Sequence, residues 1–180
     1  MQQDSTQLLK DLEDLLNKSI QQIKAFKQMS SEQLNYRTHA KSWSILECLE
    51  HLNLYGDFYL PEMEQAIIKS KSTTSKQFKS GLLGNYFAEL MRAEKGKKMA
   101  SPKDKNPIYS TLNETTIIRF EKQAERLKHI LELAKKANLN TVKCSISISR
   151  FIKLKLGDTL RFYIYHIDRH IQQAAKIQPE

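Results

Sequence analysis

Three histidines in the sequence have the type and spacing to bind a metal ion. His166 and His170 are four residues apart in a segment with helical periodicity, which places both imidazoles on one face of a helix, about one turn apart. A pair at this spacing can reach a single ion, but the same spacing also occurs in partly buried structural pairs. The segment contains no HExxH motif, so a zincin-type pair with a glutamate base is absent.

The third histidine, His51, lies between the apolar residues Leu49 and Leu52 of another predicted helix. An imidazole buried there without a partner would be costly. If the two helices are neighbours, the nitrogens of His51, His166 and His170 can converge at one level and leave further coordination positions for water or substrate. The alternative is a core histidine that is hydrogen-bonded to a side chain or a carbonyl, and the spacing alone leaves both interpretations open.

Four amphipathic helices are predicted to position these residues. Apolar residues recur at intervals of three and four, Ser44 and Glu47 form a capping-box pattern, and the chain contains only 5 Gly and 4 Pro. We therefore predict an all-α fold, a four-helix bundle. With 180 residues, of which 40% are hydrophobic, we expect one domain over residues 1–180. The predicted helices cover residues 5–29, 44–67 with a kink near Pro61, 113–138 with Asn113 as cap, and 158–177 before a polar tail at Gln178.

The connections are less regular. Residues 69–79 are predicted to be a solvated connection, and residues 81–91 a short helix or a lid-like segment. Residues 140–156 alternate partially between apolar and polar, which predicts either extended backbone or an irregular crossover.

The formal net charge of +9 is concentrated in one segment. Residues 69–105 contain ten basic and three acidic residues. This basic segment could steer an anionic substrate or thiol, contact nucleic acid, or form a solvated loop, and the last interpretation is the commonest. Because its aromatic residues match no RNA-binding signature, nucleic acid is not an expected partner.

The remaining composition indicates the compartment. The N-terminus lacks a basic start followed by an apolar stretch, and no segment approaches the roughly 18 apolar residues that cross a bilayer. Cys48 and Cys144 are far apart without a CxxC motif, which is typical of reduced thiols. We expect a cytoplasmic protein with no membrane partner.

Two stretches resemble a known family. The residues from Lys41 to Leu52, KSWSILECLEHL, resemble the start of the second helix in the DinB-like (DinB/YfiT-like) superfamily of metalloenzymes, where Trp-Ser/Thr is followed by His-Leu. The residues from Leu160 to Gln173 are similar to that family's closing His-x3-His helix, which ends in Gln. The resemblance covers nearly the whole chain and implies a four-helix bundle. It also implies that a divalent metal, often zinc or nickel, is bound by His51, His166 and His170.

The resemblance also implies a reaction class. Family members of known activity are mostly thiol-dependent transferases or isomerases that use low-molecular-weight thiols. We therefore expect a metal-dependent enzyme, a thiol-dependent S-transferase or related transferase, that acts on small electrophiles. The alternative is a non-catalytic, metal-binding helical bundle that binds an acidic partner through its basic segment. The sequence leaves open the metal, the thiol, the electrophile and whether the protein forms a homodimer.

Several residues near the histidines have competing interpretations. Cys48 precedes His51 by three residues and could be a fourth ligand, but free cysteines usually pack as small hydrophobes. Trp43 could form a substrate platform, although packing over the end of the bundle is the preferred interpretation. Tyr55 and Tyr163 are at helical distance from the histidines, and core packing is expected for both.

Carboxylates could orient the imidazoles, because metal-bound histidines usually donate their second N–H to an acceptor. Glu47 is one candidate, although it also serves the helix cap. Asp168 is another, but it lies between the two histidines and should point away from their face. His39 and His129 have no partner pattern and are expected on the surface.

Overall fold

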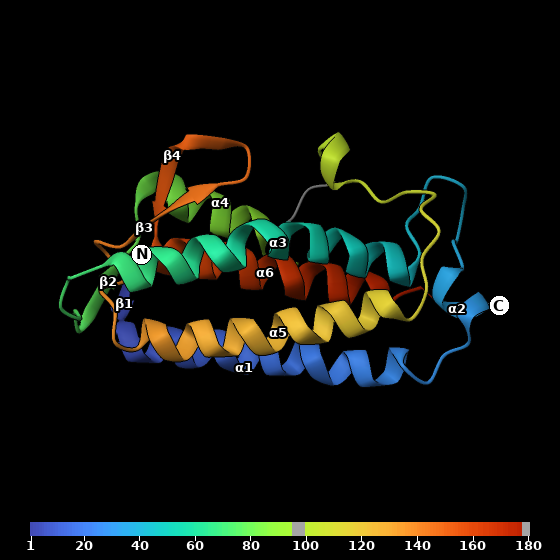
Figure 1. The fold of residues 1–180 in the computed structure, drawn as a ribbon, viewed down its shortest axis with the longest axis horizontal. Helices are drawn as coiled ribbons and strands as arrows, with labels where there is room; N and C mark the ends of the chain where they lie inside the picture. The colour runs from blue at the N-terminus through green and yellow to red at the C-terminus, as the bar shows by residue number, and fades with distance from the viewer. Residues whose placement is uncertain (95–99, 178–180) are drawn as a thin grey trace.

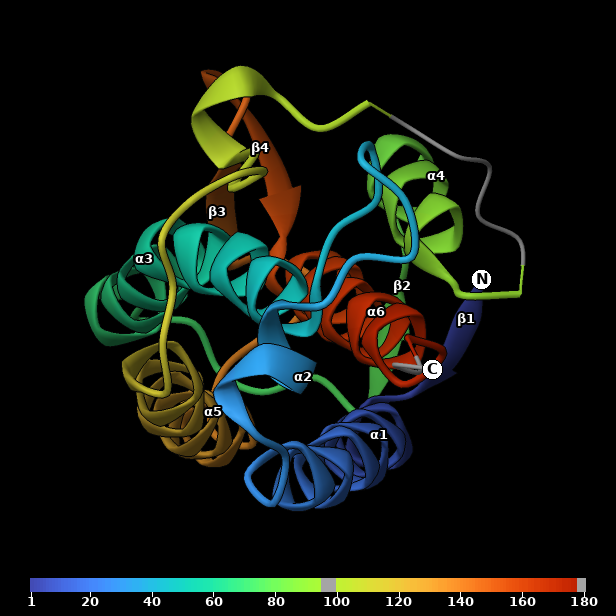
Figure 2. The same cartoon turned by 90° about the vertical axis from the view of Figure 1, so that its right-hand side faces the viewer.

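The computed structural model describes residues 1–94 and 100–177, and four long helices form its body. They are α1 (Ser5–Phe26), α3 (Ile45–Lys69), α5 (Thr115–Ala134) and α6 (Leu156–Ala174). All four run along the long axis of the molecule (Figure 1). Seen end-on, they surround one core, with α1 and α3 each lying beside both α5 and α6 (Figure 2). The predicted four-helix bundle is confirmed.

Smaller elements pack around this bundle. A short helix, α4 (Leu82–Met91), packs along the outside of α6, and a hairpin of β3 (Lys143–Ile146) and β4 (Ser149–Lys155) packs against α3, α4 and α6 (Figure 2). The others are α2 (Ser31–Asn35), the 3-10 helix η1 (Lys103–Lys105), and the antiparallel pair of β1 (Gln2–Asp4) and β2 (Gln77–Lys79).

The helix boundaries follow local capping chemistry. Ser44 accepts a hydrogen bond from the Glu47 N–H, and the Glu47 side chain accepts one from the Ser44 N–H, which is the predicted capping box. The Asn113 side chain accepts from the Thr115 N–H at the start of α5, one residue outside the helix cap. Helix α3 continues through Pro61. Predicted boundaries are wrong by two to four residues at the ends of all four long helices and at the start of α6.

Two connections differ from a simple loop. The prediction that residues 69–79 are solvated is wrong at Phe78, which lies in β2 and is fully buried. Its ring packs on Gly157, where an added Cβ would lie 2.5 Å from the ring, so this contact requires glycine. Of the two alternatives for residues 140–156, the extended one is correct, because these residues contain the β3–β4 hairpin. The helix predicted for residues 81–91 is α4.

The core is one continuous cluster of buried apolar side chains contributed by all four long helices. Its continuity agrees with a single domain over residues 1–180, which stays a prediction. Among the described helices, none combines the length and the hydropathy needed to cross a bilayer. The polar tail predicted from Gln178 onward lies outside the described residues.

Candidate metal centre

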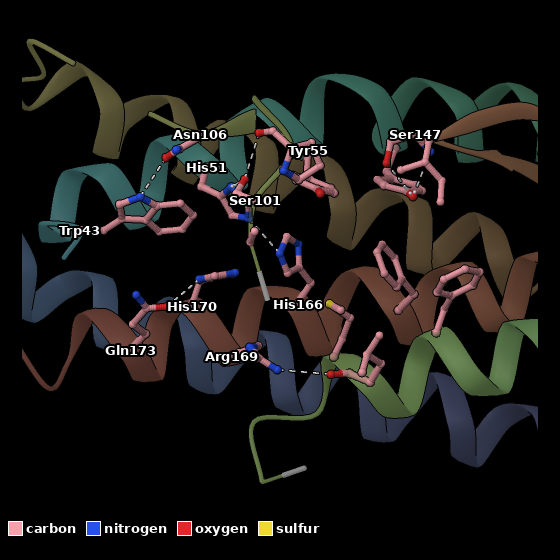
Figure 3. Close-up of a pocket in the computed structure, with 18 of the residues that line it drawn as sticks. Trp43, His51, Tyr55, Ser101, Asn106, Ser147, His166, Arg169, His170 and Gln173 are labelled. Atoms are coloured by element: carbon pink, nitrogen blue, oxygen red, sulfur yellow. Dashed lines mark hydrogen bonds between the residues drawn. The ribbon is translucent and has the colours of Figure 1, made fainter. Parts of the chain in front are cut away.

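The three predicted histidines meet between α3 and α6. Helix α3 contributes His51, and α6 contributes His166 and His170 from successive turns (Figure 3). The Nε2 atoms of His51 and His166 are 3.1 Å apart, and one ligand atom from each of the three rings lies within 4.8 Å of the others. All three side chains are at most 9% exposed. The tertiary structure therefore brings together the residues that the sequence singled out.

Two of the three imidazoles have their Nδ1 atoms held by oxygen acceptors. His51 Nδ1 lies 2.6 Å from the Lys105 carbonyl oxygen, and His170 Nδ1 lies 3.0 Å from Gln173 Oε1. Because a carbonyl oxygen can only accept, each Nδ1 must carry the proton, which leaves the lone pair on Nε2. Both rings thus present an unprotonated Nε2, the kind of atom that binds a metal, and without a metal His51 Nε2 can accept from a His166 Nε2–H at 3.1 Å.

This arrangement fits a divalent metal ion. Two nitrogens bound to one zinc at about 2.0–2.1 Å are about 3.3 Å apart in a tetrahedral site, close to the observed separation between His51 and His166. His166 Nδ1 is also buried and has no hydrogen-bond partner within the described part of the chain. Three neutral imidazole nitrogens are a donor set suited to a divalent transition metal.

The surroundings keep the imidazoles neutral. Burial lowers the pKa of His51 to about 4, and the charge of Lys105 adds to the effect, although the bond to the Lys105 carbonyl opposes it. Burial, together with the charges of His51 and Arg169, lowers the pKa of His170 to about 3. The pKa of His166 is lowered well below its usual value, first by burial and then by the other two histidines and Arg169. Neutral imidazole is the form that binds metal.

The histidines form one wall of a cavity of about 620 Å³. A site of this size suits a drug-sized ligand. Figure 3 shows the cavity extending along the bundle from Trp43 and Gln173 past the histidines to Ser147 in the hairpin. The described residues that line it come from α3, α4, α6, the hairpin and two loops: 39, 41–43, 51, 55, 59, 87, 90, 91, 100–102, 106, 108, 146–148, 154, 162, 166, 169, 170 and 173.

Both carboxylates considered as imidazole partners have other roles. Glu47 accepts from Arg37 and from the backbone N–H groups of Ser44 and Tyr109. Burial would raise the pKa of Glu47, but these bonds outweigh it, so the pKa is lowered. Asp168 accepts from Gln172 and does not line the cavity. The acceptors found instead are the Lys105 carbonyl and Gln173.

The structure also separates the aromatic candidates. Tyr55 lines the cavity, with its ring centroid 4.6 Å from that of His166, whereas Tyr163 is buried in the core away from it. The prediction of core packing is therefore confirmed for Tyr163, whereas Tyr55 packs on the core and also lines the cavity. Trp43 packs on the core, as preferred, and also lines the cavity, with its ring centroid 4.7 Å from that of His51. Its role as a substrate platform stays a prediction.

The remaining candidates lie outside the histidine group. Cys48 is fully buried in the core and is not among the described residues that could share a metal, which confirms its interpretation as a core thiol. His129 is exposed, as expected, while the exposed His39 lines the edge of the cavity.

Several site residues were missed by sequence reasoning. Gln173 could have been found, because it follows His170 by three residues and so lies one helical turn away. Arg169 could not have been assigned from spacing alone. The Lys105 carbonyl comes from the last residue of the basic segment, and Asn106, which accepts from the Trp43 indole, follows it; no sequence pattern pointed to either. Within that segment, Lys95, Lys97 and Lys98 lie outside the described residues.

Fold and site together define a four-helix bundle with a three-histidine cluster facing a cavity. A family model of the DinB superfamily matches residues 21–174, and the chain belongs to that superfamily. This confirms the resemblance noted in the sequence. Searches of curated proteins and of solved structures gave no match.

Proposed function

We propose that the protein is a metal-dependent enzyme that transfers a low-molecular-weight thiol to a small electrophile. His51, His166 and His170 would hold one divalent ion, zinc or nickel. The observation that carries this proposal is the pair of Nδ1 hydrogen bonds to the Lys105 carbonyl and Gln173, which leave Nε2 of His51 and of His170 unprotonated and so able to bind a metal.

A bound divalent ion would lower the pKa of a thiol and hold the resulting thiolate. The chain's own residues favour an anion at the same place. The positive charge of Arg169 acts on His166 and His170, and the charge of Lys105 acts on His51. These charges disfavour protonated imidazoles and attract an anionic group that binds beside them.

Tyr55 can assist by hydrogen bonding. Burial first, and then the neighbouring Tyr59 and Asp104, raise the pKa of the Tyr55 hydroxyl to about 12, so it stays protonated at neutral pH. Its ring lies against the rings of His51 and His166 in the cavity wall. A protonated hydroxyl there can donate to a substrate oxygen on which negative charge develops.

The test is the metal content of protein purified without a histidine tag, followed by a thiol-consumption assay. We expect about one equivalent of transition metal in the wild type, little in His51→Ala and His166→Ala, and a full equivalent in the exposed-histidine control His129→Ala. Thiol consumption with an electrophile should follow the metal content. No metal in the wild type, even after zinc or nickel is added, would overturn the proposal. Metal without thiol consumption would favour the non-catalytic alternative.

A further inference from the structure

The cavity continues well beyond the histidines. One part of it lies between α4, α6 and the β3–β4 hairpin, towards Ser147 in Figure 3. We name this part the apolar arm. Its wall is formed by six side chains from five elements: Tyr59, Phe87, Leu90, Ile146, Leu154 and Phe162. None of these residues is needed to hold a metal ion, so the arm requires a different explanation.

The arm offers an apolar surface to a ligand. Phe87, Leu90 and Phe162 are half-buried and line the cavity, so their apolar side chains are accessible to a ligand. Tyr59, Ile146 and Leu154, each at most 4% exposed, complete the wall. The polar atoms at its far end already have partners, because the Tyr59 hydroxyl accepts from the Ser147 N–H at 3.2 Å and lies 3.3 Å from the Ser147 hydroxyl. Because these groups already bond to each other, a polar ligand group gains little there in exchange for its lost hydration, whereas an apolar group gains by leaving water.

The opposite part of the cavity is electropositive. No Asp or Glu is found among the described residues that line the cavity, while Lys41 and Arg169 both contribute to its wall at the histidine end. The Arg169 guanidinium donates to the carbonyl of Leu90, so the two parts of the cavity meet at this residue, and the charge of Arg169 acts on His166 and His170. The cavity thus has a positive end and an apolar end, which together match a ligand with an anionic group and an apolar body.

We propose that the apolar arm receives the aliphatic or aromatic body of an anionic small molecule, whose anionic group lies at the histidine end beside Arg169. This inference rests on the proposed function, because it names the chemical class of a substrate for the same site. A cavity of about 620 Å³ has room for such a molecule. The arm then acts as the part of the site that selects substrates by the size of their apolar body.

The chain carries its own reporter for this binding. Trp43 is the single tryptophan and lines the cavity beside His51. Its fluorescence can be followed while metal-free and zinc-loaded protein are titrated with straight-chain carboxylates from butanoate to decanoate. We expect the affinity to rise about three- to fourfold per methylene until the arm is full. Decanoate should bind more than tenfold tighter than the neutral decanol.

A matched pair of variants on α4 locates the binding. Phe87→Glu places a carboxylate in the arm, whereas Leu82→Glu places the same charge on the outer surface of the same helix, where Leu82 is 96% exposed. Circular dichroism checks that both variants fold. We expect Phe87→Glu to weaken decanoate binding more than tenfold and Leu82→Glu to leave it unchanged. Equal effects of the two variants would overturn the inference.

Zinc content measured in the same samples separates this inference from the proposed function. If the protein binds zinc but its affinity for carboxylates does not depend on their chain length, the apolar arm is overturned and the metal proposal stands. If the affinity for carboxylates rises with chain length but the protein binds no zinc, the arm is supported and the metal proposal is overturned. Decanol that binds as tightly as decanoate would overturn the assignment of an anionic group.

Discussion

The two halves of helix α6 carry two polar clusters with opposite character. In the N-terminal half, Arg161 and Asp158 are fully buried. The terminal nitrogens of Arg161 bond to Asp158, Glu89, Asn85 and Ser80, which docks α4 and the preceding loop on α6. Asp158 accepts in addition from the Ser80 hydroxyl and the Gly81 N–H. Opposite charges meet here, and Arg161 Nε is the one guanidinium nitrogen without a partner among the described residues.

The C-terminal half presents groups of the same kind. His166 and His170 meet the third base, His51, and no carboxylate from the described residues joins them. If more than one of these imidazoles were protonated, the rings would repel one another. The cluster also faces a cavity, whereas the Arg161 cluster is covered by α4.

The two clusters on α6 show how a polar cluster that stabilises the fold can be told apart from one that can bind a ligand. Complementary charges that bond to each other stabilise the docking of two elements, provided that every partner is present. The three buried histidines beside the cavity have no oppositely charged partner among the described residues. A bound cation would supply that partner, and three predictions test this difference.

The largest expected effect is the acid sensitivity of the metal-free protein. His51 and His170 have pKa values lowered to about 4 and about 3, and that of His166 is also lowered, so below about pH 6.5 the unfolded chain binds more protons than the folded chain. The free energy of unfolding should therefore fall as the pH drops from about 6.5 towards 4, by up to about 1.4 kcal/mol per pH unit for each histidine. Urea unfolding in the presence of a chelator measures this slope.

The control for this slope is a pair of substitutions. His166→Leu removes one buried base and should make the dependence on pH shallower, whereas His129→Leu removes an exposed histidine and should leave it unchanged. An equal slope in all three proteins would show that the buried cluster does not govern acid stability.

The next effect concerns the Arg161 cluster. Arg161→Ala leaves Asp158 buried without its guanidinium partner and should lower the free energy of unfolding by about 3–5 kcal/mol. The folded variant should keep the full metal content, because the metal site lies in the other half of α6. Arg126→Ala, which removes a partly exposed ion pair with Glu64, should cost less than about 1 kcal/mol. Loss of metal together with stability would break the separation between the two halves.

The smallest effect concerns the partner of one imidazole. Gln173→Ala removes the acceptor for His170 Nδ1 and should weaken zinc affinity about 10- to 100-fold with little change in folding. The neighbouring Gln172→Ala is the matched control, because Gln172 bonds to Asp168 and points away from the site. A competition titration with a zinc indicator measures both. Equal affinities in the two variants would show that Gln173 does not orient the ring.

Much of the bundle could be predicted from local chemistry. The three-and-four spacing of apolar residues located the four long helices, and Ser44 with Glu47 located the start of α3. The ends of α1 and α5 were predicted too far because helices end through turns whose residues differ little from helical ones. Phe78 was missed because one buried aromatic residue in a polar stretch has no periodicity.

The sequence by itself determined the type of site. The four-residue spacing of His166 and His170 and the apolar surroundings of His51 are local properties, and helical geometry converts them into positions on a face. Spacing also suffices to bring Gln173 to His170. These residues form the part of the site that a helix builds without help from other elements.

Only the tertiary structure decided what surrounds the histidines. The Lys105 carbonyl reaches His51 across 54 residues of chain, and the apolar arm needs α4 and the hairpin to lie against α3 and α6. Every residue has a backbone carbonyl, so the sequence does not indicate which one bonds to His51. The wall of the arm comes from five separate elements, so its residues do not recur at any regular spacing in the sequence. The packing of the helices therefore decided the shape and charge of the cavity, while the sequence determined only which donor atoms could face it.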